Sequence, residues 1–151
     1  MIRKALTALL AWSLAMLGVL AVVAPAYASQ PLRAHAAARG ILIGTAVATG
    51  PLANETPYRT AAAREFNAVT AENAMKWDAT EPNRGQFTFT AADQVMAFAE
   101  ANGQQVHGHT LVWHSQTPGW VQGLDATQLR QAMQQHIATV VGRYAGRVQA
   151  W

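Results

Sequence analysis

The chain has 151 residues, no cysteine, 51% hydrophobic residues and only 13% charged ones. This composition excludes a disordered charged tail, a disulfide-stabilised scaffold and a zinc ribbon. The net charge of +3 does not indicate a nucleic-acid-binding or lipid-binding protein, because Arg3 and Lys4 supply two of the 11 basic residues and leave nine against eight acidic ones.

Residues 1–28 have the three-part layout of a secretory signal peptide. Two basic residues near the start precede an apolar run over residues 5–24, and Pro25 followed by the small-x-small triplet 26–28 predicts cleavage after Ala28. An uncleaved membrane anchor is the alternative, because roughly 18 or more apolar residues can span a bilayer. We expect a secreted protein, extracellular or periplasmic, that leaves the membrane once the signal is cleaved.

The rest of the chain is expected to hold a leader and one domain. Residues 29–39 are rich in Ala and Arg, show little hydrophobic pattern, and are interpreted as a leader to a domain over residues 40–151. Within that domain, β-rich and helical patterns alternate. Strands are expected at residues 41–47, 68–73 and 105–113, with a fourth beginning at 147–151, and helices are expected at residues 58–66, 90–102 and 125–145.

Local signals mark the ends of the two longer helices. Thr90, three residues before Asp93, is placed as an N-cap, and Gly103 is placed as a C-terminal stop. Asp125 and Gln128 form a capping-box pattern at the start of the longest helix. That helix carries an apolar stripe at the 3.6-residue period, which we expect to be buried: Leu129, Met133, Ile137, Val140 and Tyr144.

Alternating strands and helices predict an α/β protein with a parallel sheet. The spacing fits a partial (β/α)8 TIM barrel, about the first three and a half βα units, because a complete barrel needs about 250 residues. An open doubly wound sheet is the alternative at this length, although it would normally continue into a helix after its last strand. Residues 147–151 look like the start of a strand, so we interpret the sequence as an incomplete, N-terminal portion of a barrel.

Two of the expected strands carry polar residues at their C-terminal ends, where buried parallel strands are usually continuous Val, Ile and Leu. Those ends form the active-site face of a βα barrel. At the strand over residues 68–73 the candidates are Glu72, Asn73 and Lys76, with Trp77 beside them. The alternative is a structural role, with a buried ion pair and an Asn that satisfies a loop carbonyl.

The strand at residues 105–113 adds His107, His109 and Trp113, and His114 follows it. A His-x-His pair can be half of a metal site in barrel hydrolases, with the remaining ligands supplied by other strands. Core histidines that hydrogen-bond to the backbone are a second interpretation.

A carbohydrate cleft is the third interpretation of these residues. Sugars present many hydroxyl groups and flat apolar faces, so their sites combine Asn, Glu, Lys and His with Trp as a stacking surface. Trp77, Trp113 and Trp120 all lie at strand ends or in the loops that follow. A nucleic-acid site would need Arg and Lys interleaved with these rings, and only Lys76 is near.

Three segments resemble the retaining endo-1,4-β-xylanases of glycoside hydrolase family 10. They are FNAVTAENAMKWDATEPNRGQFTF, HGHTLVWHSQTPGWV and HIATVVGRYAGRVQAW, and the resemblance extends over residues 41–151. It implies a (β/α)8 barrel with a cleft for xylan or xylo-oligosaccharide at its C-terminal face.

The resemblance also implies substrate-binding roles for six residues. In the pattern E-N-x-x-K, three side chains would hydrogen-bond the sugar units on the non-reducing side of the cleaved bond: Glu72, Asn73 and Lys76. In G-H-T-L-V-W-H, His109 and Trp113 would border the sugar at the cleavage point, with His114 in the supporting network.

The resemblance places both catalytic carboxylates outside this sequence. Retaining hydrolysis uses an acid/base and a nucleophile whose carboxyl groups are about 5 to 5.5 Å apart. The family's acid/base is the Glu of W-D-V-V-N-E, and Trp151 matches the W of that motif. We therefore expect no catalytic residue in this chain, and we expect the chain alone to be inactive although the full-length enzyme hydrolyses xylan.

The remaining expectations concern cofactors and partners. We expect no metal, no other cofactor, no nucleic acid, no membrane partner after signal cleavage, and a monomer at full length. Two alternatives stay open: a metal-dependent barrel hydrolase that uses His107 and His109, and a non-catalytic sugar-binding remnant.

Overall fold

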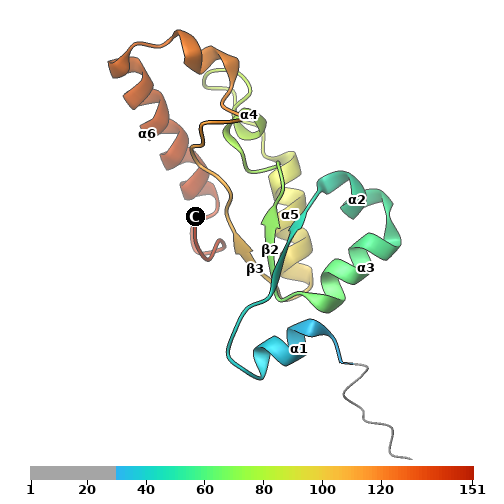
Figure 1. Cartoon of the computed structure of the whole chain (residues 1–151). Helices are drawn as coiled ribbons and strands as arrows, with labels where there is room; N and C mark the ends of the chain where they lie inside the picture. The colour runs from blue at the N-terminus through green and yellow to red at the C-terminus, as the bar shows by residue number, and fades with distance from the viewer. Residues whose placement is uncertain (1–29) are drawn as a thin grey trace, which may run out of the picture. The chain divides into compact units, whose positions relative to one another are not determined.

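Three parallel strands form the centre of the structure, a computed structural model that describes residues 30–151 (Figure 1). The signal peptide expected at residues 1–28 lies outside the described residues. Strand β1 (Gly44–Val47) pairs with β2 (Ala68–Ala71), and β2 pairs with β3 (Gln105–His107). The spatial order β1-β2-β3 follows the chain order, as in a βα barrel, whereas a doubly wound sheet reverses its order at a switch point.

Helices connect the strands and return the chain to the sheet. Helix α3 (Thr56–Glu65) lies between β1 and β2, and α5 (Thr90–Ala101) lies between β2 and β3. After α6 (Ala126–Arg143), Ala150 forms a parallel bridge with His107 beside β3. The bridge lies where the fourth strand is expected, so the described residues confirm the predicted α/β class and its sequential parallel sheet.

The third strand is shorter than predicted, because the expected strand at residues 105–113 ends at His107. The pairing partner of His107 is Thr70, and β2 ends one residue later at Ala71. No strand of the described chain therefore continues beside residues 109–113 on that side, and a backbone without a partner leaves the ladder. The consequence is that His109 and Trp113 lie in a loop and not in a strand.

Four short helical segments occupy stretches that were expected to be loops or leader. They are α1 (Leu32–Ala37), α2 (Thr49–Asn54), α4 (Trp77–Thr80) and the 3-10 turn η2 (Gly119–Gly123). None is longer than 6 residues, which is too short for a hydrophobic period to show in the sequence.

Helix α1, in the segment expected to be a leader, is fastened to the rest of the structure by Arg33. The guanidinium donates to the carbonyl oxygens of Ala63 at 2.9 Å, Asn102 at 3.0 Å and Gly103 at 3.3 Å. These carbonyls lie where α3 and α5 end, so one cation satisfies acceptors that both helices leave unpaired.

The helix-end predictions have mixed outcomes. The capping box of α6 is confirmed, since the Asp125 carboxylate accepts from the backbone N–H of Gln128 at 2.8 Å and the Gln128 side chain accepts from the Asp125 N–H at 3.3 Å. Gly103 has a φ of +59° just after α5, which confirms the stop. The N-cap prediction for Thr90 is wrong, because Thr90 is the first residue of α5 and Phe89 precedes it as the N-cap.

The core lies between the sheet and the helices. Its fully buried members include Val69 and Val106 from the strands, Met96 from α5 and Val140 from α6. A second, smaller cluster gathers around Trp77 beyond the carboxyl ends of the strands. Within residues 30–151, no helix is long and apolar enough to cross a membrane.

The predicted apolar stripe of α6 is only partly buried. Val140 and Tyr144, near the end of the helix, are buried in the core, whereas Leu129 and Met133 are partly exposed. His136 is fully buried instead. The first half of α6 therefore packs against the second hydrophobic cluster, around Trp77, and not against the sheet.

Candidate functional site

Polar side chains meet beyond the carboxyl ends of β2 and β3, in a group that we call the platform: Asn73, Lys76, Trp113 and Gln116. Lys76 Nζ donates to Asn73 Oδ1 at 2.9 Å and also to Gln116 Oε1. The Gln116 amide closes the ring by donating to Asn73 Oδ1 at 3.3 Å. An ammonium has three donors, so these two bonds leave one N–H of Lys76 for a ligand.

Trp113 provides the apolar part of the platform. Lys76 Nζ lies 4.9 Å from the Trp113 ring centroid, within cation–π range, and Trp113 as a residue is 37% exposed. The ring centroids of His109 and His114 lie 5.9 Å and 5.2 Å from that of Trp113. An exposed indole beside fixed hydrogen-bond donors suits a ligand with one apolar face and several hydroxyl groups.

The structure brings five of the six predicted binding residues into one chain of contacts: Asn73, Lys76, Trp113, His109 and His114. Glu72 lies beside Asn73 at the end of β2, where its N–H donates to the Val47 carbonyl at 3.0 Å. Its exposed carboxylate makes no hydrogen bond within the described residues, so it is an open acceptor next to the platform.

Gln116 belongs to the platform although sequence reasoning did not select it. It is the one non-glycine residue with a positive φ in the described chain, at +52°. Its backbone carbonyl accepts from the Asp78 N–H at 3.3 Å, which links the loop after β3 to α4. A strained backbone that is held by side-chain and main-chain bonds on both sides is typical of a functional loop.

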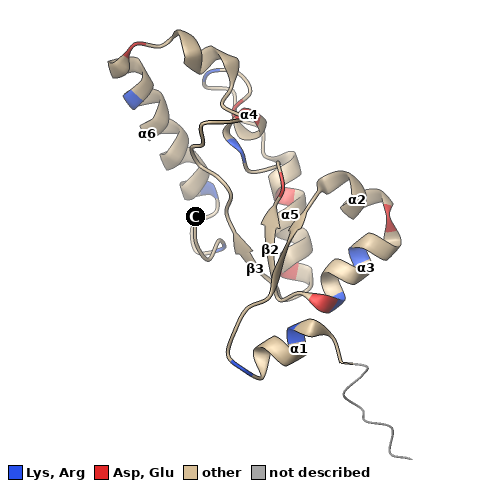
Figure 2. Ribbon diagram, in the orientation of Figure 1, with Lys and Arg blue, Asp and Glu red and all other residues tan. Residues whose placement is uncertain are grey.

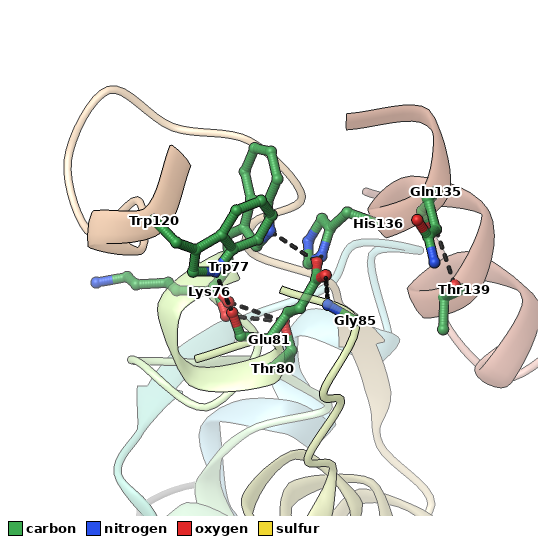
Figure 3. A network of polar contacts seen from close by, with 9 residues as sticks. All are labelled: Lys76, Trp77, Thr80, Glu81, Gly85, Trp120, Gln135, His136 and Thr139. Carbon is green, nitrogen blue, oxygen red and sulfur yellow. Dashed lines mark hydrogen bonds and ion pairs between the residues drawn. The ribbon is translucent and has the colours of Figure 1, made fainter. Parts of the chain in front are cut away.

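Next to the platform lies a group that we call the Glu81 cluster: the buried Trp77, Glu81 and His136 and the partly buried Trp120 (Figure 3). Glu81 Oε2 accepts from Trp77 Nε1 at 3.0 Å and lies 3.1 Å from His136 Nδ1, and Oε1 accepts from the Gly85 N–H at 2.8 Å. The Glu81 backbone carbonyl accepts from Trp120 Nε1 at 3.2 Å. One residue therefore joins α4, η2 and α6.

The protonation of this cluster follows from its burial. His136 is completely buried, and desolvation lowers the pKa of its ring below the ordinary value, against the opposing effects of the Glu81 carboxylate and the Leu111 carbonyl. Trp77 and Gly85 can only donate, so both Glu81 oxygens act as acceptors. A neutral His136 that carries its proton on Nδ1 donates it to Glu81 Oε2.

Most other carboxylates of the described chain have structural partners. Asp93 accepts from Arg143 and Tyr144, Glu100 accepts from Arg147, and Asp125 caps α6. The Arg143 bond holds the pKa of Asp93 below its usual range, and burial together with Asp93 raises the pKa of Tyr144 to about 12. These carboxylates are therefore committed to packing α5 and α6 together or to ending helices.

The metal hypothesis gains no support from the described residues. Within residues 30–151, no group of three or more His, Cys, Asp or Glu side chains is placed to hold a metal ion. His107 lies on β3 and His109 lies in the following loop beside Trp113. Figure 2 shows Lys and Arg in blue and Asp and Glu in red distributed over several elements of the described chain.

Comparison with known proteins gives matches to one family of glycosyl hydrolases. The sequence model described as glycosyl hydrolase family 10 matches residues 31–151. Endo-1,4-beta-xylanase B of Humicola insolens is 60% identical over 89 residues, which are 58% of this chain and 25% of that protein. Endo-1,4-beta-xylanase 3 of Hypocrea jecorina is 44% identical over 112 residues, which are 74% of this chain and 32% of that protein.

Solved structures agree with the sequence relatives. Xylanase 10B from Thermotoga petrophila RKU-1, crystallised in complex with xylobiose, superposes with a TM-score of 0.76 at 42% identity, covering 80% of this chain and 38% of that one. The chain thus spans about a quarter to two fifths of the length of the relatives it matches. The match begins at residue 31, so α1 lies within it.

Proposed function

The chain belongs to glycosyl hydrolase family 10, and on that basis we propose that it forms part of the xylan-binding cleft of a secreted endo-1,4-β-xylanase. The fold is the first part of a (β/α)8 barrel, and the matching relatives are xylanases. The observation that carries the proposal is that Lys76 donates hydrogen bonds to both Asn73 and Gln116 beside the exposed Trp113 ring.

The platform offers each kind of contact that a chain of sugar units needs. The uncommitted N–H of Lys76 and the amide of Asn73 donate to hydroxyl oxygens, and the open Glu72 carboxylate accepts from hydroxyl groups. Trp113 presents an apolar surface on which a sugar ring stacks, and His109 and His114 border it. Because Lys76 is only 8% exposed and already held by two acceptors, its ammonium is ordered before the sugar arrives.

We propose that this part of the enzyme binds xylan and does not perform the cleavage. Retaining hydrolysis needs two carboxyl groups about 5 to 5.5 Å apart on either side of the glycosidic bond. Glu72 lies at the platform, but Glu81 is buried beneath Trp77 and Asp93 is tied to Arg143. The described residues therefore supply sugar-binding groups, and the carboxylate pair is proposed to come from other barrel strands. No cofactor enters this chemistry.

The same proposal covers the destination and state of the protein. Residues 1–28 have the layout of a signal peptide, which fits an enzyme that degrades a polymer outside the cell. We propose that the full-length enzyme is a secreted monomer that acts on xylan or xylo-oligosaccharide.

Titration of the purified chain with xylotetraose, followed by calorimetry and Trp fluorescence, tests the proposal. We expect saturable binding that weakens about tenfold or more in K76M, because loss of a charge-assisted hydrogen bond corresponds to roughly one decade or more in affinity. R130M is the matched control, since Arg130 lies on the exposed face of α6 and makes no hydrogen bond within the described residues. Equal affinity of K76M and the unaltered chain, or absence of binding by an unaltered chain that unfolds cooperatively in urea, would refute the proposal.

A further inference from the structure

The segments that carry the platform are loops without a strand partner. Asn73 and Lys76 follow the end of β2, and Trp113 and Gln116 lie in the loop after β3. Neither segment has ladder hydrogen bonds of its own in the described sheet. Something else must hold them, because a sugar site is effective only when its groups are already in place.

Both segments are fastened to Glu81. On one side, Trp77 directly follows Lys76 and donates its indole N–H to Glu81 Oε2 at 3.0 Å. On the other side, Trp120, in the η2 turn that follows the Gln116 loop, donates to the Glu81 backbone carbonyl at 3.2 Å. Thr80, one residue before Glu81, donates through its hydroxyl to the Lys76 carbonyl at 3.0 Å. Figure 3 shows the Lys76 side chain extending away from these anchors.

His136 connects this anchor to a rigid element. It comes from the middle of α6, lies 55 residues from Glu81 in sequence, and stacks on Trp77 with a ring-centroid distance of 4.6 Å and an interplanar angle of 21°. Its Nδ1 lies 3.1 Å from Glu81 Oε2, and both side chains are nearly or completely buried. Its second ring nitrogen, Nε2, is buried and has no hydrogen-bond partner in the described residues.

A purely packing role does not account for this arrangement. Burying a carboxyl group and an imidazole together is costly, and apolar side chains of similar size would pack α6 against α4 at lower cost. The polar pair adds a defined orientation that apolar packing does not give. The two hydrogen bonds to Oε2 fix the orientation of the Glu81 carboxyl group and of the Trp77 ring.

We propose that Glu81 and His136 are positioning residues for the platform: the Glu81 carboxylate and His136 hold Trp77, and with it the adjacent Lys76, in the sugar-binding geometry, while the Glu81 backbone carbonyl holds Trp120 in the segment that follows Gln116. The inference rests on the proposed xylan-binding role of the platform. It assigns the correct placement of the platform side chains to two buried residues that touch no sugar. It implies that changes at His136 act on ligand affinity through Lys76.

Two His136 variants separate positioning from packing. H136F keeps a flat ring stacked on Trp77 and removes the donor to Glu81, whereas H136N removes the ring and retains an amide donor near the place of Nδ1. We expect H136F to weaken xylotetraose binding by about tenfold, the scale of one charge-assisted hydrogen bond, and H136N to recover part of that loss. E81Q, which offers fewer acceptors, should weaken binding like H136F.

A double-mutant cycle with K76M gives a readout that simple destabilisation does not produce. If His136 acts through Lys76, H136F should have little further effect on binding in the K76M background. D93N is the matched control: it weakens the α5–α6 contact with Arg143, so it should lower stability and leave affinity unchanged. Additive effects of H136F and K76M, or a loss of affinity in D93N equal to that in H136F, would overturn the proposal.

An NMR measurement on the ligand-free chain keeps this test separate from that of the proposed function. The indole N–H resonances of Trp77 and Trp113, assigned by single Trp-to-Phe changes, report on the cluster and on the platform. Under the proposal, H136F shifts both resonances and H136N restores that of Trp113 in part. A shift confined to Trp77 would show that His136 does not position the platform, whatever the outcome of the sugar titration.

Discussion

Replacing Arg33 should lower the free energy of unfolding of the domain without changing its affinity for a ligand. The guanidinium makes three hydrogen bonds to backbone carbonyls, at 2.9, 3.0 and 3.3 Å, and each acceptor lies at the end of α3 or α5. A hydrogen bond to a charged group contributes about 1.5 to 3 kcal/mol when buried, and the part-buried setting here reduces that value. Counting about 1 kcal/mol for each of the two shorter bonds, R33L should lower the free energy of unfolding by about 2 kcal/mol.

The assay is urea unfolding followed by far-UV circular dichroism, with calorimetric melting as a second measurement. A loss of about 2 kcal/mol in a domain of this size corresponds to a fall in Tm of roughly 5 to 10 °C. R39L is the matched control, because Arg39 is exposed just after α1 and its side chain makes no hydrogen bond within the described residues. Equal stability of R33L and R39L would refute the reasoning that one cation fastens α1 to both helix ends.

Two further predictions concern α6. Burial lowers the pKa of His136, so between that pKa and the ordinary value of 6.5 the unfolded chain binds more protons than the folded chain, and stability rises with pH. Acidification from pH 7 to 5 should therefore lower the free energy of unfolding measured in urea titrations. An equal pH dependence in H136F would contradict this. D125A removes the capping box and should lower the free energy of unfolding by about 1 kcal/mol, whereas D125N, which still accepts at the helix start, should lose less; equal losses in the two variants would show that the hydrogen bond is not responsible.

The strands and long helices could be predicted because each repeats a period that the sequence displays. The α5 stop at Gly103 and the α6 capping box follow from single residues with defined backbone roles. The end of β3 could not be predicted in this way, because it depends on where the neighbouring strand β2 ends. The length of a strand depends on how far its neighbour pairs with it. The sequence pattern of residues 105–113 alone therefore does not predict where β3 ends.

The platform also contains residues that could be predicted from the sequence and one that could not. Asn73, Lys76 and Trp113 stand out in the sequence because polar and aromatic residues at the carboxyl ends of parallel strands have few structural uses. Gln116 does not stand out, since an amide in a loop near Pro and Gly is ordinary, and only its positive φ and its bonds to the other two side chains reveal it. His136 was hidden for a different reason: a polar residue on a helix is expected to face solvent.

Arg33 and His136 together define a test of how the fold separates stability from binding. Arg33 acts where β2 and β3 begin, and His136 acts beyond the ends of the same strands, beside the platform. R33L removes the hydrogen bonds donated by the Arg33 guanidinium, and H136F removes the ring nitrogen that faces Glu81, so both variants should lower the free energy of unfolding. Only H136F disturbs a bond that continues through Trp77 to the segment of Lys76, so only H136F should also lower affinity for xylotetraose at temperatures where both proteins are folded. Equal losses of affinity in R33L and H136F would mean that the platform depends on overall stability, and the positioning role of His136 would then have to be abandoned.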